Sequence, residues 1–258
     1  MAYKFSSEQI DALRLLKEAV APASWVLIGG AGLACQMEVP RITQDLDFIV
    51  AIDVQDYYEL MERLPHIESS SVPEHRWITP QNVTIDIIPA GIGSVLNSTL
   101  LWPKSGSSMN MTGVNLAFQH TVSQEIADDL VIKVAQKRVI LFLKMVACLD
   151  TSYPREKDLI DIIAIITENI LPDDERWTND VFEKKIDYEY SSAFICGNEL
   201  KEIVSDNEKV VVREFISKVK DETKPIQPLM AKLGRKWRHN PDKMLKYIDL
   251  FMTGFEGN

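Results

Sequence analysis

Two short apolar segments, one ending in glycines and the other beginning with aspartates, most constrain what this chain can fold into. The segment "SWVLI", residues 24–28, has the length and composition of a buried strand, and it stops at Gly29 and Gly30. The segment "DLDFIVAI", residues 45–52, predicts a second strand, and "AGLACQM" and "VPRITQ" between them predict a short helix and a loop. This order of strand, Gly-Gly turn, helix and strand is typical of an α/β unit.

The second strand carries two aspartates spaced one residue apart. Side chains alternate between the faces of a strand, so Asp45 and Asp47 share one face while Leu46 and Phe48 share the other. Two carboxylates this close repel each other unless a cation or water lies between them. Hard oxygen ligands at this spacing suit Mg²⁺, or Mn²⁺ in its place, together with substrate phosphates. The pair therefore predicts a divalent-metal site.

A third carboxylate occurs in the apolar segment "VTIDIIPA", residues 83–90. Asp86 lies between two isoleucines in this predicted strand, and an aspartate is costly to bury without a partner. If this strand lies beside the strand of residues 45–52, Asp86 joins Asp45 and Asp47. Three carboxylates on adjacent strands would make a site for one or two divalent ions.

Gly29 and Gly30 suit a turn that binds an anion. Glycine lets the backbone approach a ligand closely and accepts a positive φ, and a strand followed by Gly-Gly and a helix directs backbone N–H groups at an anion. A nucleoside triphosphate would lie between these groups and the metal ions. Each feature alone has an ordinary explanation, since Gly-Gly is commonly a tight turn and Asp-x-Asp a solvated edge or a cap. Their order along the chain favours metal and phosphate chemistry.

The order of Gly-Gly, a short helix, "RITQDLDFIV" and "IDIIPA" resembles the nucleotidyltransferase fold of the polymerase-beta type. The signature of that family is a Gly-Gly or Gly-Ser turn, then Asp-x-Asp, then a third aspartate on a later strand. The resemblance implies that Asp45, Asp47 and Asp86 bind metal, and that Asp86 also helps to activate the acceptor hydroxyl. It implies that Gly29 and Gly30 contact the triphosphate.

Two further features bear on this resemblance. Arg41 and Thr43 match the "R-x-T-x-D-x-D" form that is common in small bacterial members, which implies that they bind the nucleotide. The lysine- and arginine-bearing motif of the family has no matching counterpart between residues 50 and 110, where Arg76 and Lys104 are the candidates to replace it.

A later stretch, "FLKMVACLDTSYPREKDLIDI", resembles the "K…R-x-K-D-x-x-D" motif of the abortive-infection toxin nucleotidyltransferases, the toxin halves of type IV toxin–antitoxin systems. The resemblance covers residues 25–165 by motif. It implies catalytic roles for Lys144 and Asp158, nucleotide binding by Lys144 and Asp161, and an antitoxin protein as a partner.

The same residues have a physical interpretation of their own. Lys144 lies in the apolar stretch "VILFLKMVA", so it either meets an anion or extends its ammonium group to the helix surface. Asp158 and Asp161 are three residues apart, which places both on one helical face. Acidic residues are favourable near the start of a helix. This structural explanation suits Asp158 better than Asp161, which apolar residues flank on both sides.

The fold class predicted is α/β (α+β), with a small mixed β-sheet flanked by helices over residues 1–134 and a mostly α-helical portion over residues 135–258. Further strands are expected over "HRWIT" and "VTIDIIPA", and loops with short strands or turns over residues 91–118. A mostly helical part is expected to begin at His120. Helices are expected over 7–20, 53–65, 136–149, 156–168, 176–186, 190–204, 206–220 and 225–253. Ser7 is the candidate cap of the first, and the last is expected to break at Asn240-Pro241.

Composition excludes several classes of protein. The net charge of −10 argues against a protein that grips nucleic acid with its whole surface. No apolar run reaches the length of a membrane span, and the N-terminus lacks the layout of a signal peptide. The cysteines at 35, 148 and 196 lie in apolar contexts, as reduced thiols of a cytoplasmic protein do.

Two functional classes remain. The first is an enzyme that transfers a nucleoside monophosphate from NTP to an acceptor hydroxyl of tRNA, a protein or a small molecule, with Mg²⁺ or Mn²⁺ as cofactor. The second is a non-catalytic nucleotide-binding or regulatory module that keeps the fold. The clustered aspartates favour the enzyme, because a module without chemistry has no physical need for three carboxylates in one place.

Overall fold

A computed structural model describes residues 3–39, 43–66, 73–150, 155–167, 176–224, 226–227, 229–230, 233 and 241–257 of the chain. The chain divides into two compact units, Met1–Ile140 and Leu141–Asn258. The predicted domains, 1–134 and 135–258, stay a prediction.

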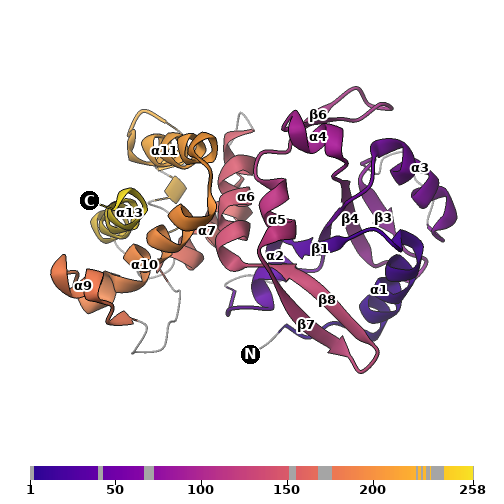
Figure 1. Ribbon diagram of the computed structural model, residues 1–258, viewed down its shortest axis with the longest axis horizontal. Coiled ribbons are helices and arrows are strands. Elements are labelled where there is room, and N and C mark those ends of the chain that lie inside the picture. The colour runs from indigo at the N-terminus through magenta and orange to yellow at the C-terminus, as the bar shows by residue number, and fades with distance from the viewer. Residues whose placement is uncertain are drawn as a thin grey trace. The chain divides into compact units, whose positions relative to one another are not determined.

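A six-stranded mixed sheet organises the first unit (Figure 1). Its strand order is β3-β4-β2-β1-β8-β7, so β3 and β7 are the edges. β2 pairs with β4 in parallel and with β1 in antiparallel orientation, and β1 pairs with β8 in parallel. The mixed sheet with flanking helices confirms the predicted fold class. The strands are β1 (Trp25–Ile28), β2 (Leu46–Val50), β3 (Arg76–Ile78), β4 (Thr84–Pro89), β7 (Thr121–Ala127) and β8 (Leu130–Ala135).

The two faces of the central strands differ in what they bury. On one face Leu27, Phe48 and Ile87 are fully buried, because large apolar side chains from neighbouring strands pack in register. The opposite face is apolar at one end, where Ile49 is buried, and polar at the other, where it carries Asp47. The polar end of this face is the place at which the sequence concentrates its carboxylates.

The helices of the first unit include two that the sequence did not predict. Residues 91–118, expected to form loops with short strands or turns, contain helices α4 and α5 as well as a two-stranded sheet. α1 begins at the predicted residue, but its cap is Ser6 and not Ser7, with Ser6 and Gln9 forming a reciprocal capping box. The remaining elements of this unit are α1 (Ser7–Val20), α2 (Gly29–Ala34), α3 (Val54–Arg63), α4 (Ile92–Leu96), β5 (Thr99–Leu101), β6 (Ser108–Asn110) and α5 (Val114–Gln119).

Two other predictions of secondary structure are wrong. The mostly helical part does not begin at His120, because the residues that follow form the β7–β8 hairpin. In β8 the residues alternate between buried and exposed, so the period of two decides the structure. The Gly-Gly pair is also not a turn that precedes a helix, because α2 begins at Gly29 itself.

Helices are the regular elements of the second unit within its described ranges, as predicted. α6 (Lys137–Leu149) begins in the first unit and continues into the second. α10 and α13 pack very closely, because a Cβ atom on Gly197 would collide with the backbone carbonyl of Phe251, and one on Gly254 with that of Phe194. The other helices are α7 (Glu156–Thr167), α9 (Asn179–Glu183), α10 (Tyr188–Ile203), α11 (Asp206–Lys220) and α13 (Pro241–Glu256).

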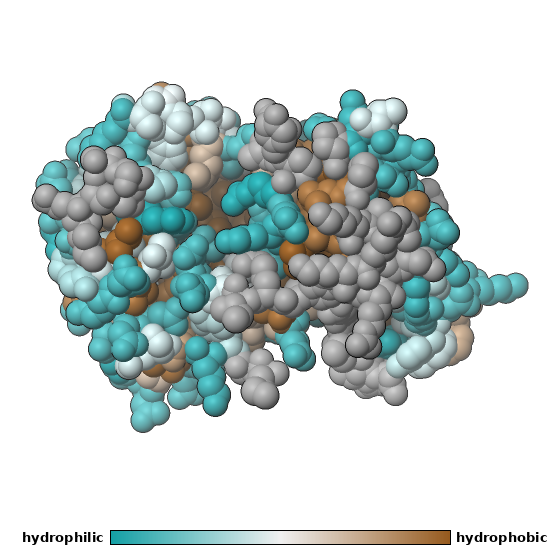
Figure 2. All heavy atoms as spheres, turned by 180° about the vertical axis from the view of Figure 1, so that it is seen from behind, coloured by the Kyte–Doolittle hydropathy of each residue, from teal (hydrophilic) through white to brown (hydrophobic). Residues whose placement is uncertain are grey.

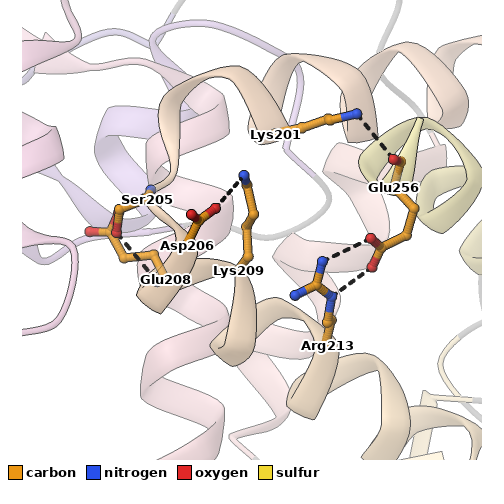
Figure 3. A network of polar contacts seen from close by, with 7 residues as sticks. All are labelled: Lys201, Ser205, Asp206, Glu208, Lys209, Arg213 and Glu256. Carbon is orange, nitrogen blue, oxygen red and sulfur yellow. Dashed lines mark hydrogen bonds and ion pairs between the residues drawn. The ribbon is translucent and has the colours of Figure 1, made fainter.

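A polar network ties the end of α13 to α10 and α11 (Figure 3). Arg213 donates two hydrogen bonds, each 2.8 Å long, to the two carboxylate oxygens of Glu256. Lys201 donates to the backbone carbonyl of the same residue at 3.0 Å. Ser205 and Glu208 form a capping box at the start of α11. These contacts fix the last turn of α13 by charge-assisted hydrogen bonds.

The surface is mainly hydrophilic on the face that Figure 2 shows, with hydrophobic residues gathered in a few places. Of the helices in the described part of the chain, none has the length and apolarity that a membrane crossing requires. The three cysteines are present as thiols.

Candidate active site

Asp47 and Gly29 are in direct contact. A Cβ atom at position 29 would overlap Oδ2 of Asp47, so the carboxylate fills the space that any other side chain would take. Gly29 also has φ +65°, in the left-handed region that favours glycine. Both the conformation and the close approach therefore require glycine. The pairing of Ile28 with Asp47 across β1 and β2 brings the two together.

One row of paired residues, which begins at Ile28 on β1, crosses four strands of the sheet at this point. Asp47 on β2 pairs in register with Asp86 on β4, and Asp86 pairs with Arg76 on β3. Residues paired in register lie on the same face of a sheet, and neighbouring strands are about 4.8 Å apart. Two carboxylates and one guanidinium group thus lie side by side on the polar end of one face.

Asp86 is held by a two-point ion pair. Arg76 donates from Nε to Oδ1 at 2.7 Å and from its terminal nitrogen to Oδ2 at 2.8 Å. His75 Nε2 lies 3.8 Å from Oδ2. The pKa of Arg76 is raised, first by its hydrogen bonds to Asp86 and further by the charges of Asp45 and Asp47. Arg76 therefore lies in the field of all three predicted carboxylates.

Asp45 lies just before β2, not within it. Its backbone carbonyl accepts a hydrogen bond from Thr43 Oγ1 at 3.4 Å. The N-terminal part of the chain holds the same segment, since Tyr3 donates to the carbonyl of Thr43 at 3.5 Å and Gln9 to that of Gln44 at 3.4 Å. Burial raises the pKa of Tyr3, and the charge of Asp45 acts in the same direction. The N-terminus therefore positions the first aspartate.

The three aspartates are suitable ligands for a divalent cation, but they are not arranged closely enough in this structure to hold one. Asp45, Asp47 and Asp86 supply only hard carboxylate oxygens, the ligands that Mg²⁺ and Mn²⁺ prefer. Within the described ranges, no three carboxylate, histidine or cysteine side chains are grouped closely enough to hold an ion as they stand. At Asp86, both oxygens accept hydrogen bonds from Arg76, so a cation there would compete with the guanidinium.

A second cluster lies in the other unit, where Lys144 on α6 meets two carboxylates of α7. Its Nζ is 2.9 Å from Oδ1 of Asp158 and 2.8 Å from Oδ2 of Asp161. The three side chains are only 7%, 10% and 1% exposed, and Arg155 Nε lies 2.9 Å from Oδ2 of Asp158. Burial opposes the charge of Lys144, but the two carboxylates outweigh it and raise the pKa. Of the two interpretations of Lys144, the structure thus shows the lysine that meets anions.

The structure places the predicted site residues in two groups. Gly29, Gly30 and the three aspartates 45, 47 and 86 belong to the first unit, while Lys144, Asp158 and Asp161 belong to the second. Arg41 lies outside the described residues, and Thr43 lies beside Asp45.

Arg76 was not predicted as the partner of Asp86, although the sequence carries a signal for this pairing. The segments "HRWIT" and "VTIDI" flank "PQN", and a hairpin centred on Gln81 places Arg76 opposite Asp86. Tyr3 and Gln9 were also missed. Their contacts with residues 43 and 44 are long-range, and no local pattern in the sequence indicates them.

Comparison with known proteins now decides the family. Residues 12–225 match the family described as "Nucleotidyl transferase AbiEii toxin, Type IV TA system". The chain belongs to the AbiEii family. It is therefore a nucleotidyltransferase of the kind found as the toxin of type IV toxin–antitoxin systems, as the sequence motifs predicted. No protein of curated function matches the sequence.

Solved structures with a similar arrangement are distant. An antigenic nucleotidyltransferase-like protein from Paracoccidioides brasiliensis has 14% identity and a TM-score of 0.42, over 96% of this chain and 95% of that one. JHP933 from Helicobacter pylori has 16% identity and a TM-score of 0.33, over 91% and 97%. The lincosamide antibiotic adenylyltransferase LnuA, solved with lincomycin bound, has 19% identity and a TM-score of 0.36, over 62% and 96%. At these TM-scores the family assignment rests on the sequence match alone.

Proposed function

We propose that this AbiEii protein transfers a nucleoside monophosphate from NTP to an acceptor hydroxyl, with Mg²⁺ or Mn²⁺ held by Asp45, Asp47 and Asp86. The observation that carries the proposal is the row of Asp47 and Asp86 in register beside Gly29. A structural role alone gives no reason to place two carboxylates side by side and to leave no room for a side chain at position 29. The membership of a nucleotidyltransferase family supports the same chemistry.

The roles of the residues follow from their places. Gly29 keeps the Asp47 carboxylate against the backbone, and the N–H groups of Gly29 and Gly30 would bind the triphosphate. When bound, the divalent ion would neutralise charge on the attacking and leaving oxygens. Asp86 accepts the proton of the acceptor hydroxyl, which then attacks the α-phosphate in line, and pyrophosphate leaves. Catalysis of this kind depends on positioning and charge more than on covalent chemistry.

The remaining residues of the proposed site act on the nucleotide. Arg41 and Thr43 precede the Asp-x-Asp pair and would contact it. The motif resemblance implies catalysis and nucleotide binding for Lys144, Asp158 and Asp161, but their burial favours an indirect contribution. Because the Lys144 ammonium is buried and paired with both aspartates, we assign this cluster a positioning role, in which it holds α6 and α7 together.

The biological setting of the reaction is also part of the proposal. Because the family is that of type IV toxins, we expect an antitoxin protein as a partner and a cytoplasmic location. The acceptor is a tRNA, a protein or a small molecule, and the net charge of −10 favours none of them. The competing proposal is a nucleotide-binding module without catalysis.

A labelling experiment separates these proposals. The full chain is incubated with Mg²⁺, each α-³²P-labelled NTP in turn, and total tRNA, protein lysate or aminoglycosides as acceptors. The double variant D45A/D47A is the control. Label that enters one acceptor class and is lost in the variant supports the enzyme. Binding of NTP without transfer to any acceptor supports the module, and absence of both binding and transfer contradicts the proposed site.

A further inference from the structure

Arg76 competes with the proposed metal ion for the carboxylate of Asp86. Both oxygens of Asp86 accept hydrogen bonds from one guanidinium group, at 2.7 and 2.8 Å. A two-point, charge-assisted pair of this geometry is strong. Each oxygen of Asp86 keeps a second lone pair, but a divalent cation that binds them would lie close to the positive guanidinium, and this repulsion favours displacement of Arg76.

The position of Arg76 allows such a displacement. Its side chain is 31% exposed, while that of Asp86 is 11% exposed, so the guanidinium has a route to solvent that the carboxylate lacks. Arg76 also lies on β3, an edge strand of three residues. Lys144 differs from Arg76 in this respect. Its side chain is only 7% exposed between two buried carboxylates, so its ammonium group has no route to solvent.

Charge balance explains why an arginine is needed there. Asp47 and Asp86 are neighbours in register, and unneutralised carboxylates this close repel each other. The pKa of Arg76 is raised first by Asp86 and then by Asp45 and Asp47, as expected for a cation that faces all three.

We propose that Arg76 is an internal counter-cation, which holds Asp86 in the metal-free protein and is displaced from it when a divalent cation binds. The proposal rests on the proposed function, since it concerns the same carboxylates. An arriving triphosphate can accept the released guanidinium, because arginine pairs with phosphate in the same two-point geometry. Arg76 thus lowers the affinity of the site for a metal ion when no nucleotide is bound.

The test measures the affinity of the full chain for Mn²⁺ without nucleotide, from the electron paramagnetic resonance signal of the free ion. R76M removes both the charge and the two hydrogen bonds of the guanidinium group. R76K keeps the charge but cannot make the two-point pair. R14M is the matched control, because Arg14 makes the same kind of pair with Asp129, at 2.9 and 2.7 Å, elsewhere in the first unit. D47N reports whether the bound ion occupies the proposed site.

We expect R76M to bind Mn²⁺ about five- to tenfold more tightly than the natural protein, and R76K to lie between them, as for loss of one partly exposed charge-assisted pair. R14M should bind as the natural protein does, and D47N should lose the ion. Equal or weaker binding by R76M overturns the proposal. The proposal is also overturned if R76M binds Mn²⁺ more tightly while R76K binds it as the natural protein does. That result would show that the charge of Arg76 acts at long range and that its two-point pair does not matter.

One outcome concerns the proposed function instead. If D47N binds Mn²⁺ as tightly as the natural protein does, the ion is not at these carboxylates, and both proposals are wrong. If D47N loses the ion while R76M and R76K behave as the natural protein does, the metal site stands and only the role of Arg76 is wrong. Circular dichroism of each variant checks that it is folded.

Discussion

The carboxylate of Asp47 lies where a side chain on Gly29 would have to be. G29A should therefore move Asp47 and also strain a residue at φ +65°, at a cost of about 1–3 kcal/mol. We expect nucleotidyl transfer to fall by about 100-fold, the effect of a displacement of roughly 1 Å at a reacting centre. Steady-state transfer of labelled nucleotide to the acceptor measures it.

The matched control is G93A in α4. Among the described residues, a Cβ atom at position 93 meets no atom within 4 Å, so the variant should transfer nucleotide at the natural rate. Equal activity of G29A and G93A would contradict the role given to the contact between Gly29 and Asp47.

The buried cluster around Lys144 predicts a large effect on stability. K144M leaves Asp158 and Asp161 buried and close to each other, with only the largely exposed Arg155 beside Asp158, which should cost about 3–5 kcal/mol. The triple variant K144M/D158L/D161L should recover most of this loss, because well-packed apolar residues replace a buried ion cluster at little cost. Urea denaturation followed by circular dichroism measures both.

An exposed pair on α11 provides the comparison. Lys218 and Glu214 lie 2.9 Å apart with side chains 38% and 53% exposed, so K218M should cost less than about 1 kcal/mol. Should K144M prove as mild as K218M, the cluster does not stabilise the fold. Transfer activity of the triple variant then shows whether the charges themselves serve the reaction.

The crossing of α10 and α13 depends on two glycines. In G197A the new methyl group would meet the carbonyl of Phe251, and in G254A that of Phe194, so the helices must separate. We expect each variant to lose about 1–3 kcal/mol, as for overpacking of a core. Hydrogen exchange of the amides in α10 and α13 measures the loss. N198A, one residue along α10, should change stability by about 0.5 kcal/mol or less, and equal effects of N198A and G197A would exclude the crossing as the cause.

The pair of Arg213 with Glu256 predicts a dependence on pH. The hydrogen bonds from Arg213 lower the pKa of Glu256 below its ordinary value of about 4.3. A lowered pKa in the folded state means that the stabilisation is fully present above the ordinary pKa and is lost as pH falls through the lowered one. The melting temperature of the natural protein should therefore exceed that of E256Q at pH 7, and the difference should shrink as pH falls below about 4.3. A difference that stays constant as pH falls through this range rules out the charge as its source.

Much of the fold could be predicted from local patterns in the sequence. α1 and α11 have the predicted bounds, because each has a capping serine and an apolar stripe at the helical period. β2 and β4 were predicted from apolar runs of strand length. The β7–β8 hairpin was not predicted, although Leu130, Ile132 and Val134 alternate with exposed residues. A strongly apolar helix follows directly, and the hairpin was assigned to the same helical part of the chain.

The candidate site was only partly accessible to the same reasoning. Periodicity indicates the face on which Asp47 and Asp86 lie within their own strands, but it does not say which strands are neighbours. The register of β2 with β4 sets the two carboxylates side by side. The partner of Asp86 is equally a matter of pairing, since Arg76 is ten residues earlier in the chain and meets it only across the hairpin.

The residue types on which the chemistry depends can be identified from the sequence, and so can the family through its motifs. The glycines, the aspartates and the lysine in an apolar helix are recognisable because burial of charge and positive φ are costly wherever they occur. Which charges neutralise one another depends on the fold in three dimensions. Arg76 holds Asp86, and Asp158 and Asp161 hold Lys144, because electrostatic partners are selected by distance in space, which strand order and helix packing set.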